Sequence, residues 1–228
     1  MNQPVVFVDV DTQVDFMLPT GRLYVPGAEQ IIPNLKKLMG CARERGIPVL
    51  SSADAHPPDD PSFAQWPPHC VVGTPGQRRI PETQLASPAI VPDRAAAFTP
   101  PSEWPGQTIV EKIDYDVSTN PNFDAILEAL RTRFCPSPPP RFVVFGVATE
   151  YCVRAAALAL RRRALPVDLV TDAIRAITPE GERAALAEME AAGVSLVTTE
   201  EVCAGAREDV AAGRVRLGGR EQEGLTRE

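Results

Sequence analysis

The stretch RFVVFGVATEYCV, residues 141–153, decides the fold. Its first half, residues 141–147, is an almost continuously apolar run, which is typical of a strand buried on both faces of a parallel sheet. Its second half opens a helix over about residues 150–163. The apolar face of this helix consists of Val153, Ala156, Ala157 and Leu160. A strand that runs directly into a helix is the repeating unit of an α/β protein.

The same pattern recurs on both sides of this stretch. Five more apolar runs predict strands at residues 5–11, 47–53, 108–112, 166–170 and 194–198. Helices are predicted between several of these strands. The first has Ile31, Ile32, Leu35, Leu38, Met39 and Ala42 on one face, and two others span about residues 122–133 and 179–192. The alternation predicts a three-layer α/β/α sandwich around a mainly parallel, six-stranded Rossmann-like sheet.

Two segments interrupt this alternation. Residues 54–106 are rich in Pro and Gly and carry no clear period, and loops of this length are usually functional or disordered. Beyond about residue 206 the chain becomes charged and Gly-rich. The sequence therefore predicts one domain over residues 1–205, with 54–106 as its active-site and metal loop, and a charged tail over 206–228.

Composition narrows the class of protein. Hydrophobic residues make up 44% and charged residues 23% of the 228 residues, as in ordinary globular domains. The net charge of −7 argues against nucleic acid as a partner. No apolar run approaches the ~20 residues of a membrane span, and the first residues do not resemble a signal peptide. We therefore expect a cytoplasmic protein that does not bind membranes. The composition is compatible with a homo-oligomer.

The carboxyl ends of the predicted strands carry the side chains that can do chemistry. Ligands of open α/β sheets bind at these ends. Three of the ends bear Asp11, Asp54 and Lys112, and Cys152 lies just beyond a fourth, the end of the strand at 141–147. The N–H groups in the first turn of a helix stabilise a thiolate, so Cys152 is the candidate nucleophile. An inert buried cysteine is the alternative for Cys152. The chain has five cysteines, an odd and scattered set, and we expect all of them to be reduced, with the other four structural.

Both histidines of the chain fall within the long loop. His56 and His69 lie near Asp54, and together they offer one carboxylate and two imidazoles, a donor set that suits Zn, Fe or Mn. Asp60 is the candidate for a fourth ligand. The alternative is that each histidine titrates without binding a metal.

These motifs resemble those of the nicotinamidase branch of the isochorismatase-like cysteine hydrolases. The matching segments are VDTQVDF (10–16), DAH (54–56), WPPHC (66–70), VEK (110–112) and GVATEYCV (146–153). The resemblance covers about residues 5–200. It implies that Asp11 is the general base, that Lys112 lies between Asp11 and Cys152, and that a small amide is cleaved through a thioester on Cys152.

The resemblance also implies further features of the site. The N–H groups of Ala148 and Cys152 form the oxyanion hole, beside a cis peptide bond between Val147 and Ala148. A divalent metal, with Zn as the first expectation and Fe or Mn as alternatives, is held by Asp54, His56 and His69. It binds the pyridine nitrogen of nicotinamide or the water that attacks the thioester. Phe16, Trp66 and Tyr115 are the candidates for packing against the substrate ring.

Two positions depart from the pattern of the family. Nicotinamidases commonly carry Gly and then Tyr-Ser-x-Phe after the lysine, whereas KIDYDVSTNPNFD (112–124) leaves only Tyr115 as a pocket aromatic. Asp9 occupies a strand position that is usually apolar, and a buried carboxylate there needs a partner. The alternative substrate is therefore another small amide or carbamoyl compound. A ligand-binding relative without turnover and a vinyl ether hydrolase are less favoured, because Asp11, Lys112, Cys152 and the metal set are all retained.

Overall fold

Within the described residues, seven parallel strands form one sheet. The structure, a computed structural model, describes residues 3–95, 98, 106–134 and 139–211. The strand order is β3-β4-β2-β1-β5-β6-β7, and all neighbouring strands pair in parallel. The strands are β1 (Val5–Val10), β2 (Val49–Asp54), β3 (Ala89–Val91), β4 (Gln107–Lys112), β5 (Arg141–Val147), β6 (Val167–Arg175) and β7 (Ser195–Val197).

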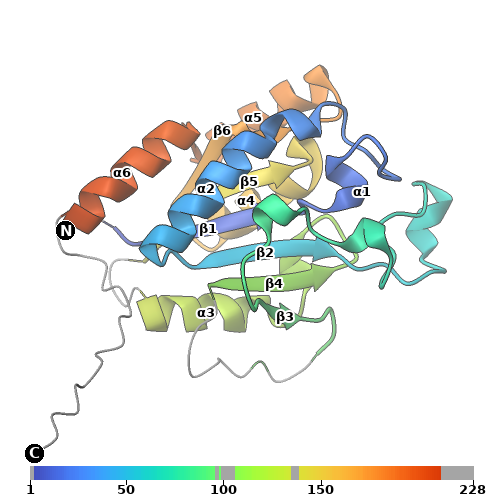
Figure 1. The fold of residues 1–228 in the computed structure, drawn as a ribbon, viewed down its shortest axis with the longest axis horizontal. Coiled ribbons are helices and arrows are strands. Elements are labelled where there is room, and N and C mark those ends of the chain that lie inside the picture. Colours follow the sequence, from blue (N-terminus) through green and yellow to red (C-terminus); the bar gives the residue numbers. More distant parts are fainter. Residues whose placement is uncertain (1–2, 96–97, 99–105, 135–138, 212–228) are drawn as a thin grey trace, which may run out of the picture.

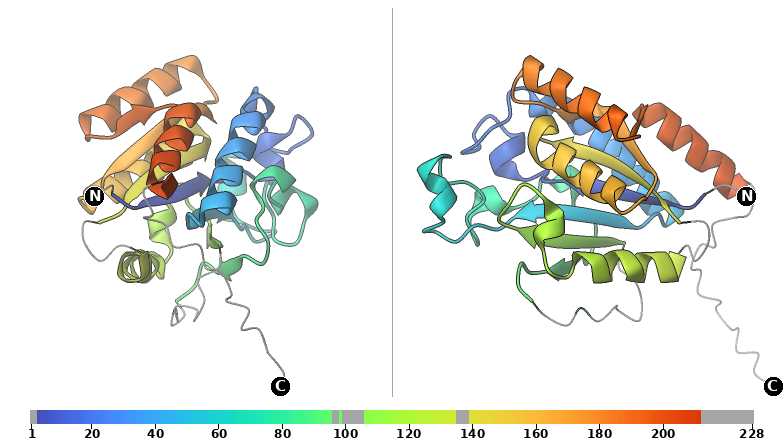
Figure 2. Two further views of the ribbon diagram at one scale, coloured as in Figure 1. Left: turned by 60° about the vertical axis from the view of Figure 1, so that its left-hand side comes forward. Right: turned by 180° about the vertical axis from the view of Figure 1, so that it is seen from behind.

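Helices cover both faces of this sheet (Figures 1 and 2). They are α1 (Val14–Met17), α2 (Ile32–Arg45), α3 (Phe123–Phe134), α4 (Arg154–Arg162), α5 (Pro179–Ala191) and α6 (Thr199–Ala211). Successive side chains of a strand point to opposite faces, so Val6, Val8 and Val10 pack with α3, α4 and α5. Phe7 packs with α2 and with Cys203 of α6 on the other face. The predicted three-layer α/β/α sandwich is confirmed.

The sheet has one strand more than the sequence predicted. The extra strand, β3, lies at the sheet edge within the segment 54–106, for which no regular structure was expected. Three short 3₁₀ turns lie in the same segment, at Pro61–Ala64, Pro75–Gln77 and Pro81–Thr83. A strand of three residues is too short to show a period, and β3 exists because it pairs with β4.

The order of the strands creates a switch point between β1 and β5. In the sheet, β2, β4 and β3 lie on one side of β1 in this order, and β5, β6 and β7, which come later in the chain, lie on the other side. Loops at the carboxyl ends of β1 and β5 therefore turn in opposite directions and leave a crevice between them. This crevice is where the sequence places Asp11 and Cys152.

The C-terminal helix extends into the segment predicted as a tail. Helix α6 runs to Ala211, while residues 212–228 lie outside the described residues. The domain boundary at residue 205 thus stays a prediction. In the part of the chain that the structure describes, no helix is both long and apolar enough to cross a membrane.

A disulfide bond between Cys41 and Cys203 corrects the expectation that all cysteines are reduced. Cys41 lies on α2 and Cys203 on α6, and the two helices pack together on one face of the sheet, with Cα atoms 6.3 Å apart. Their separation of 162 residues hid this pairing from the sequence. Cys70 and Cys152 are free and buried, and Cys135 lies outside the described residues.

Candidate active site

Cys152 lies in the turn that connects β5 to α4. This turn, Thr149–Val153, is a π-helical turn rather than the first turn of the predicted α-helix, and such turns are frequent at functional sites. The peptide bond between Val147 and Ala148 is cis, as the resemblance implied. The Ala148 carbonyl accepts hydrogen bonds from the N–H groups of Tyr151 (3.1 Å) and Val153 (3.2 Å), which fixes the turn around Cys152.

The structure brings Asp11, Lys112 and Cys152 together. Lys112 Nζ lies 2.9 Å from Asp11 Oδ2 and 3.6 Å from Cys152 Sγ. Asp11 is 0% exposed, Lys112 1% and Cys152 7%, so all three groups are shielded from bulk water. Ser52 Oγ donates a 2.6 Å hydrogen bond to Asp11 Oδ1 and leaves Oδ2 on the side of Lys112.

Electrostatics keep the thiol protonated and the lysine charged. Burial raises the pKa of Cys152 well above its ordinary value; Lys112 opposes this shift, and Asp11 and Asp54 add to it. Burial alone lowers the pKa of Lys112, but Asp11 and Asp54 outweigh it, so the pKa lies well above its ordinary value. A cysteine in this state needs a base to accept its proton before it can attack a carbonyl carbon.

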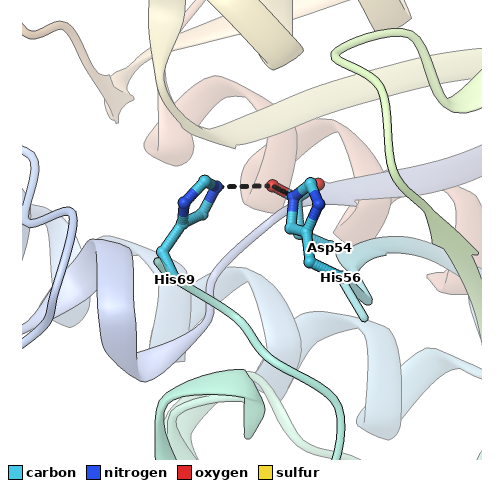
Figure 3. A group of neighbouring side chains, drawn as sticks. All are labelled: Asp54, His56 and His69. Atoms are coloured by element: carbon cyan, nitrogen blue, oxygen red, sulfur yellow. Dashed lines mark ion pairs between the residues drawn. The ribbon is translucent and has the colours of Figure 1, made fainter. Parts of the chain in front are cut away.

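Asp54, His56 and His69 form a second cluster at the same end of the sheet. Their ligand atoms all lie within 4.8 Å of one another, and all three residues are buried. The Nε2 atoms of His56 and His69 lie 3.5 Å and 3.6 Å from Asp54 Oδ2 (Figure 3). One carboxylate oxygen and two imidazole nitrogens around one centre are a donor set that fits a divalent metal such as zinc.

The other nitrogen of each imidazole is also engaged. His56 Nδ1 lies 2.9 Å from Asp60 Oδ2, and His69 Nδ1 lies 2.8 Å from the carbonyl oxygen of Pro67. Such partners fix the ring orientation and direct Nε2 at a common ligand. Burial lowers the pKa of His56, but hydrogen bonds with Asp54 and Asp60 outweigh burial and raise it.

Asp60 occupies a different place from the one expected of a fourth ligand. Its Oδ2 faces the rear of the His56 ring, and its Oδ1 accepts a 2.8 Å hydrogen bond from the N–H of Ser62. Asp60 therefore caps the 3₁₀ turn Pro61–Ala64 and orients His56, and it is not part of the three-residue cluster. The sequence spacing alone does not distinguish a ligand from a residue that supports a ligand.

Asp54 connects the two clusters. Its Oδ2 faces the imidazoles, while its Oδ1 accepts a hydrogen bond from Lys112 Nζ. Burial raises the pKa of Asp54, but Lys112 and both histidines outweigh burial, so the pKa lies far below its ordinary value. The carboxylate is therefore charged, as both a metal and Lys112 require.

A cavity of about 240 Å³ opens beside Cys152. The residues predicted to pack against a ring, Phe16, Trp66 and Tyr115, all line it, together with Asp54, both histidines and Ala148. Trp66 Nε1 donates a 2.8 Å hydrogen bond to Tyr115 Oη. Tyr151 was not predicted: its ring centroid lies 5.7 Å from that of Trp66 and 5.3 Å from that of Tyr115. Its position next to Cys152 in the TEYC motif was the available signal.

Gln13 and Asp15, two residues just after Asp11, hold the cluster in place. The Gln13 amide accepts a 2.8 Å hydrogen bond from the N–H of Asp54 and donates to the carbonyl oxygens of Asp54 and Gln77, both at 2.8 Å. Asp15 Oδ2 accepts a 2.7 Å hydrogen bond from the N–H of Cys70, next to His69. The VDTQVDF motif therefore anchors the ends of the histidine-bearing segment, a role that its sequence did not reveal.

The fold and the site together define a class. A buried cysteine at the switch point of a parallel sheet lies beside a lysine, a carboxylate and a metal-type cluster, a set of groups that can serve hydrolysis. The family model described as the isochorismatase domain matches residues 5–201. The chain belongs to the isochorismatase family, and the expected class of enzyme, a hydrolase that acts on amides, is confirmed.

Three relatives illustrate the similarity. The nicotinamidase of Escherichia coli (strain K12) is 27% identical over 210 residues, which cover 83% of this chain and 92% of the relative. A pyrazinamidase of Pyrococcus horikoshii, solved in complex with zinc, is 30% identical with a TM-score of 0.67 and covers 85% of this chain and 98% of its own. The N-carbamoylsarcosine amidase of Thermoplasma acidophilum is 26% identical with a TM-score of 0.64 and covers 86% and 96% of the two chains.

Proposed function

We propose that the protein is a nicotinamidase that hydrolyses nicotinamide to nicotinic acid and ammonia through a thioester on Cys152. The observation that carries the proposal is the contact of Lys112 Nζ with both Asp11 Oδ2 (2.9 Å) and Cys152 Sγ (3.6 Å), where Cys152 lines an aromatic cavity. The similarity to nicotinamidases and pyrazinamidases supports the choice of substrate.

The first half of the reaction forms the thioester. Asp11 accepts the proton of the Cys152 thiol, and the sulfur attacks the carboxamide carbon. The oxygen of the tetrahedral intermediate is stabilised by the N–H groups of Ala148 and Cys152. Asp11 then returns the proton to the leaving nitrogen, the C–N bond breaks, and ammonia departs.

The second half releases the acid. A water molecule gives a proton to Asp11 and attacks the thioester carbon, the C–S bond breaks, and Asp11 returns the proton to the sulfur. Lys112 stays protonated throughout, because Asp54 remains charged beside it at every step and Asp11 adds to the rise in its pKa whenever Asp11 is ionised. Its charge stabilises the thiolate each time it forms.

The cluster of Asp54, His56 and His69 is the proposed metal site, with zinc as the proposed ion. When bound there, a divalent cation offers a Lewis-acidic position in the cavity for a ring nitrogen or a water oxygen. The cluster lines the same cavity as Cys152, so a ligand at this position would be held beside the nucleophile. Phe16, whose ring centroid lies 5.4 Å from that of His69, and Trp66 would pack against the substrate ring.

The direct test of the function measures ammonia and nicotinic acid from the zinc-loaded protein and nicotinamide. We expect the two products in equal amounts and an acyl adduct on the Cys152 peptide after rapid acid quench. Release of ammonia from other amides, with none from nicotinamide, would reject nicotinamide as the substrate. Absence of turnover with every amide tried would reject an enzymatic role.

Another small amide or carbamoyl compound is the second candidate substrate. Two observations favour it: the similarity to N-carbamoylsarcosine amidase, and the segment after Lys112, which places Ile113, Asp114 and Tyr115 in the cavity wall. A carboxylate at the wall suits a substrate with a polar or cationic group better than an unsubstituted pyridine ring. Comparing kcat/KM for nicotinamide, pyrazinamide and carbamoyl compounds that are neutral or carry a cationic group decides between the two candidates.

Removal of the metal site is expected to impair both zinc binding and turnover. His69→Ala removes one of three ligands and should abolish stoichiometric zinc, whereas Asp60→Asn, which weakens the support of His56, should reduce zinc affinity about 10–100-fold. Equilibrium dialysis with metal analysis measures both effects. Asp59→Asn is the matched control, because Asp59 is exposed and adjacent to Asp60. Unchanged zinc affinity in His69→Ala would exclude this cluster as the metal site.

A further inference from the structure

A buried ion pair lies beneath the proposed general base. Asp9, on β1, is 0% exposed, and its Oδ2 pairs with Nη2 of Arg79, which is 9% exposed. Thr12 Oγ1 (2.9 Å) and Ser51 Oγ (3.2 Å) also donate hydrogen bonds to the Asp9 carboxylate. Arg79 is thus the partner that the sequence could not supply for Asp9.

Stability alone is a weak reason for such a pair. Removing two charges from water costs free energy that their attraction only partly returns, and apolar residues in their place are often as stable. The position of Asp9 is part of a strand whose other side chains, such as Phe7 and Val8, are apolar and buried. The presence of this ion pair must therefore be explained by the other groups that Asp9 and Arg79 contact.

Arg79 contacts the immediate supports of Asp11. Its Nη1 donates a 2.8 Å hydrogen bond to the carbonyl oxygen of Ser52, and its Nη2 donates at 2.6 Å to Thr12 Oγ1. Ser52 is the residue whose hydroxyl donates to Asp11 Oδ1 at 2.6 Å, and Thr12 follows Asp11 in the chain. The guanidinium thus holds at once the residue that donates to the Asp11 carboxylate and the residue that follows Asp11 in the chain.

Asp11 needs such support because of its backbone conformation. Its φ of 48° lies in the left-handed region, which residues other than glycine rarely adopt unless the surroundings enforce it. The segment that carries Arg79 also runs beside residues 12–14: the N–H of Val14 donates to Arg78 O (2.8 Å), and the N–H of Ile80 donates to Thr12 O (3.0 Å). The side chain and the backbone of this segment brace the same turn.

We propose that Asp9 and Arg79 are a positioning pair, which orients the Asp11 carboxylate toward Lys112 and Cys152 through Ser52 and Thr12. The inference rests on the proposed function, in which Asp11 is the base. Asp9 fixes the guanidinium, the guanidinium fixes the Ser52 carbonyl and the Thr12 hydroxyl, and the Ser52 hydroxyl fixes Asp11 Oδ1. Neither residue of the pair lines the cavity, so neither touches the substrate.

The kinetic test is a double-mutant cycle between Arg79→Met and Ser52→Ala, with the amide that the wild-type protein hydrolyses best. Each single variant should reduce kcat about 10–100-fold with KM within about two-fold, because misplacing a reacting group by about 1 Å has effects of this size. The double variant should lose no more than the worse single variant, since both changes break one chain of contacts. If the losses in kcat of the two single variants multiply in the double variant, the proposal is overturned.

Two further variants separate positioning from stability. Arg79→Lys keeps the positive charge beside Asp9 but lacks the planar fork, so kcat should fall while the protein stays folded. If Arg79→Met does not fold, Asp9→Asn/Arg79→Met removes both charges and takes its place in the cycle. Asp168→Asn is the control: Asp168 is a buried strand carboxylate paired with Arg141 (3.2 Å) near the amino end of β6, and its loss should leave kcat unchanged.

Crystal structures provide a readout that does not depend on turnover. In Arg79→Met, the Ser52 Oγ to Asp11 Oδ1 distance, 2.6 Å here, should exceed 3.5 Å or Asp11 should leave its left-handed conformation. If the wild-type protein hydrolyses no amide, the proposed function fails while this comparison still decides the geometry. An unchanged Asp11 in Arg79→Met, together with wild-type kcat where turnover exists, would refute the pair's positioning role.

Discussion

Replacing Cys152 by alanine is expected to reduce amide hydrolysis by about 10⁴–10⁶-fold, because the sulfur is the atom that forms the covalent intermediate. The cavity, the metal-type cluster and the ion pairs of Lys112 with Asp11 and Asp54 do not depend on the thiol. The variant should therefore stay folded, with a change in unfolding free energy of about 1 kcal/mol and a shift of about 2–4 °C in Tm. Ammonia release and thermal unfolding, measured on one preparation, test both statements.

Cys70→Ala is the matched control for this experiment. Cys70 is the other free and buried cysteine of the described residues, and its sulfur lies 4.0 Å from the Gly76 carbonyl oxygen. We expect this variant to retain hydrolysis and to form the acyl adduct on Cys152. Substantial turnover by Cys152→Ala, or loss of turnover only in Cys70→Ala, would require a different nucleophile.

Asp11→Asn is expected to have the second largest effect, a fall of about 10²–10⁴-fold in kcat. The asparagine amide has nearly the same shape and can still accept the hydrogen bond from Ser52 Oγ, but it cannot accept the thiol proton. The cost is large because burial raises the pKa of Cys152 well above its ordinary value, so the thiol is protonated at neutral pH. Steady-state ammonia release measures the fall.

The same variant should change thiol reactivity in the opposite direction. The Asp11 carboxylate is one of the groups that raise the pKa of Cys152, and Lys112 lowers it. Removing the negative charge therefore lowers the pKa of the thiol, and alkylation of Cys152 by iodoacetamide should begin at lower pH than in the wild type. Mass spectrometry of the Cys152 peptide follows this reaction separately from other cysteines.

The two readouts together identify the role of Asp11. If Asp11 is the base, Asp11→Asn should hydrolyse amides more slowly although its Cys152 thiol ionises more easily. If the Cys152 thiol of Asp11→Asn ionises more easily and the variant still hydrolyses amides at the wild-type rate, Asp11 is not the base. Asp168→Asn, at the opposite end of the sheet, should change neither quantity.

The sequence by itself determined the fold class and the principal members of the site. Strand runs such as 5–11 and 141–147 are continuously apolar because a parallel sheet is buried on both faces, so they can be recognised without any partner. The carboxyl ends of parallel strands share one edge, and for that reason Asp11, Asp54, Lys112 and the Cys152 turn could be predicted to converge. The cavity-lining positions of Phe16, Trp66 and Tyr115 followed from motif resemblance, and their roles stay predictions.

Only the tertiary structure decided the contacts between segments far apart in the chain. It paired Cys41 with Cys203, gave Asp9 the guanidinium of Arg79 and added β3 to the sheet edge. Within the long loop it also turned Asp60 to the rear of His56. No local period predicts these features, because they depend on where distant segments meet and on which way a side chain points there. A periodic pattern follows from which faces of an element are buried, whereas a polar contact follows from packing that involves the whole chain.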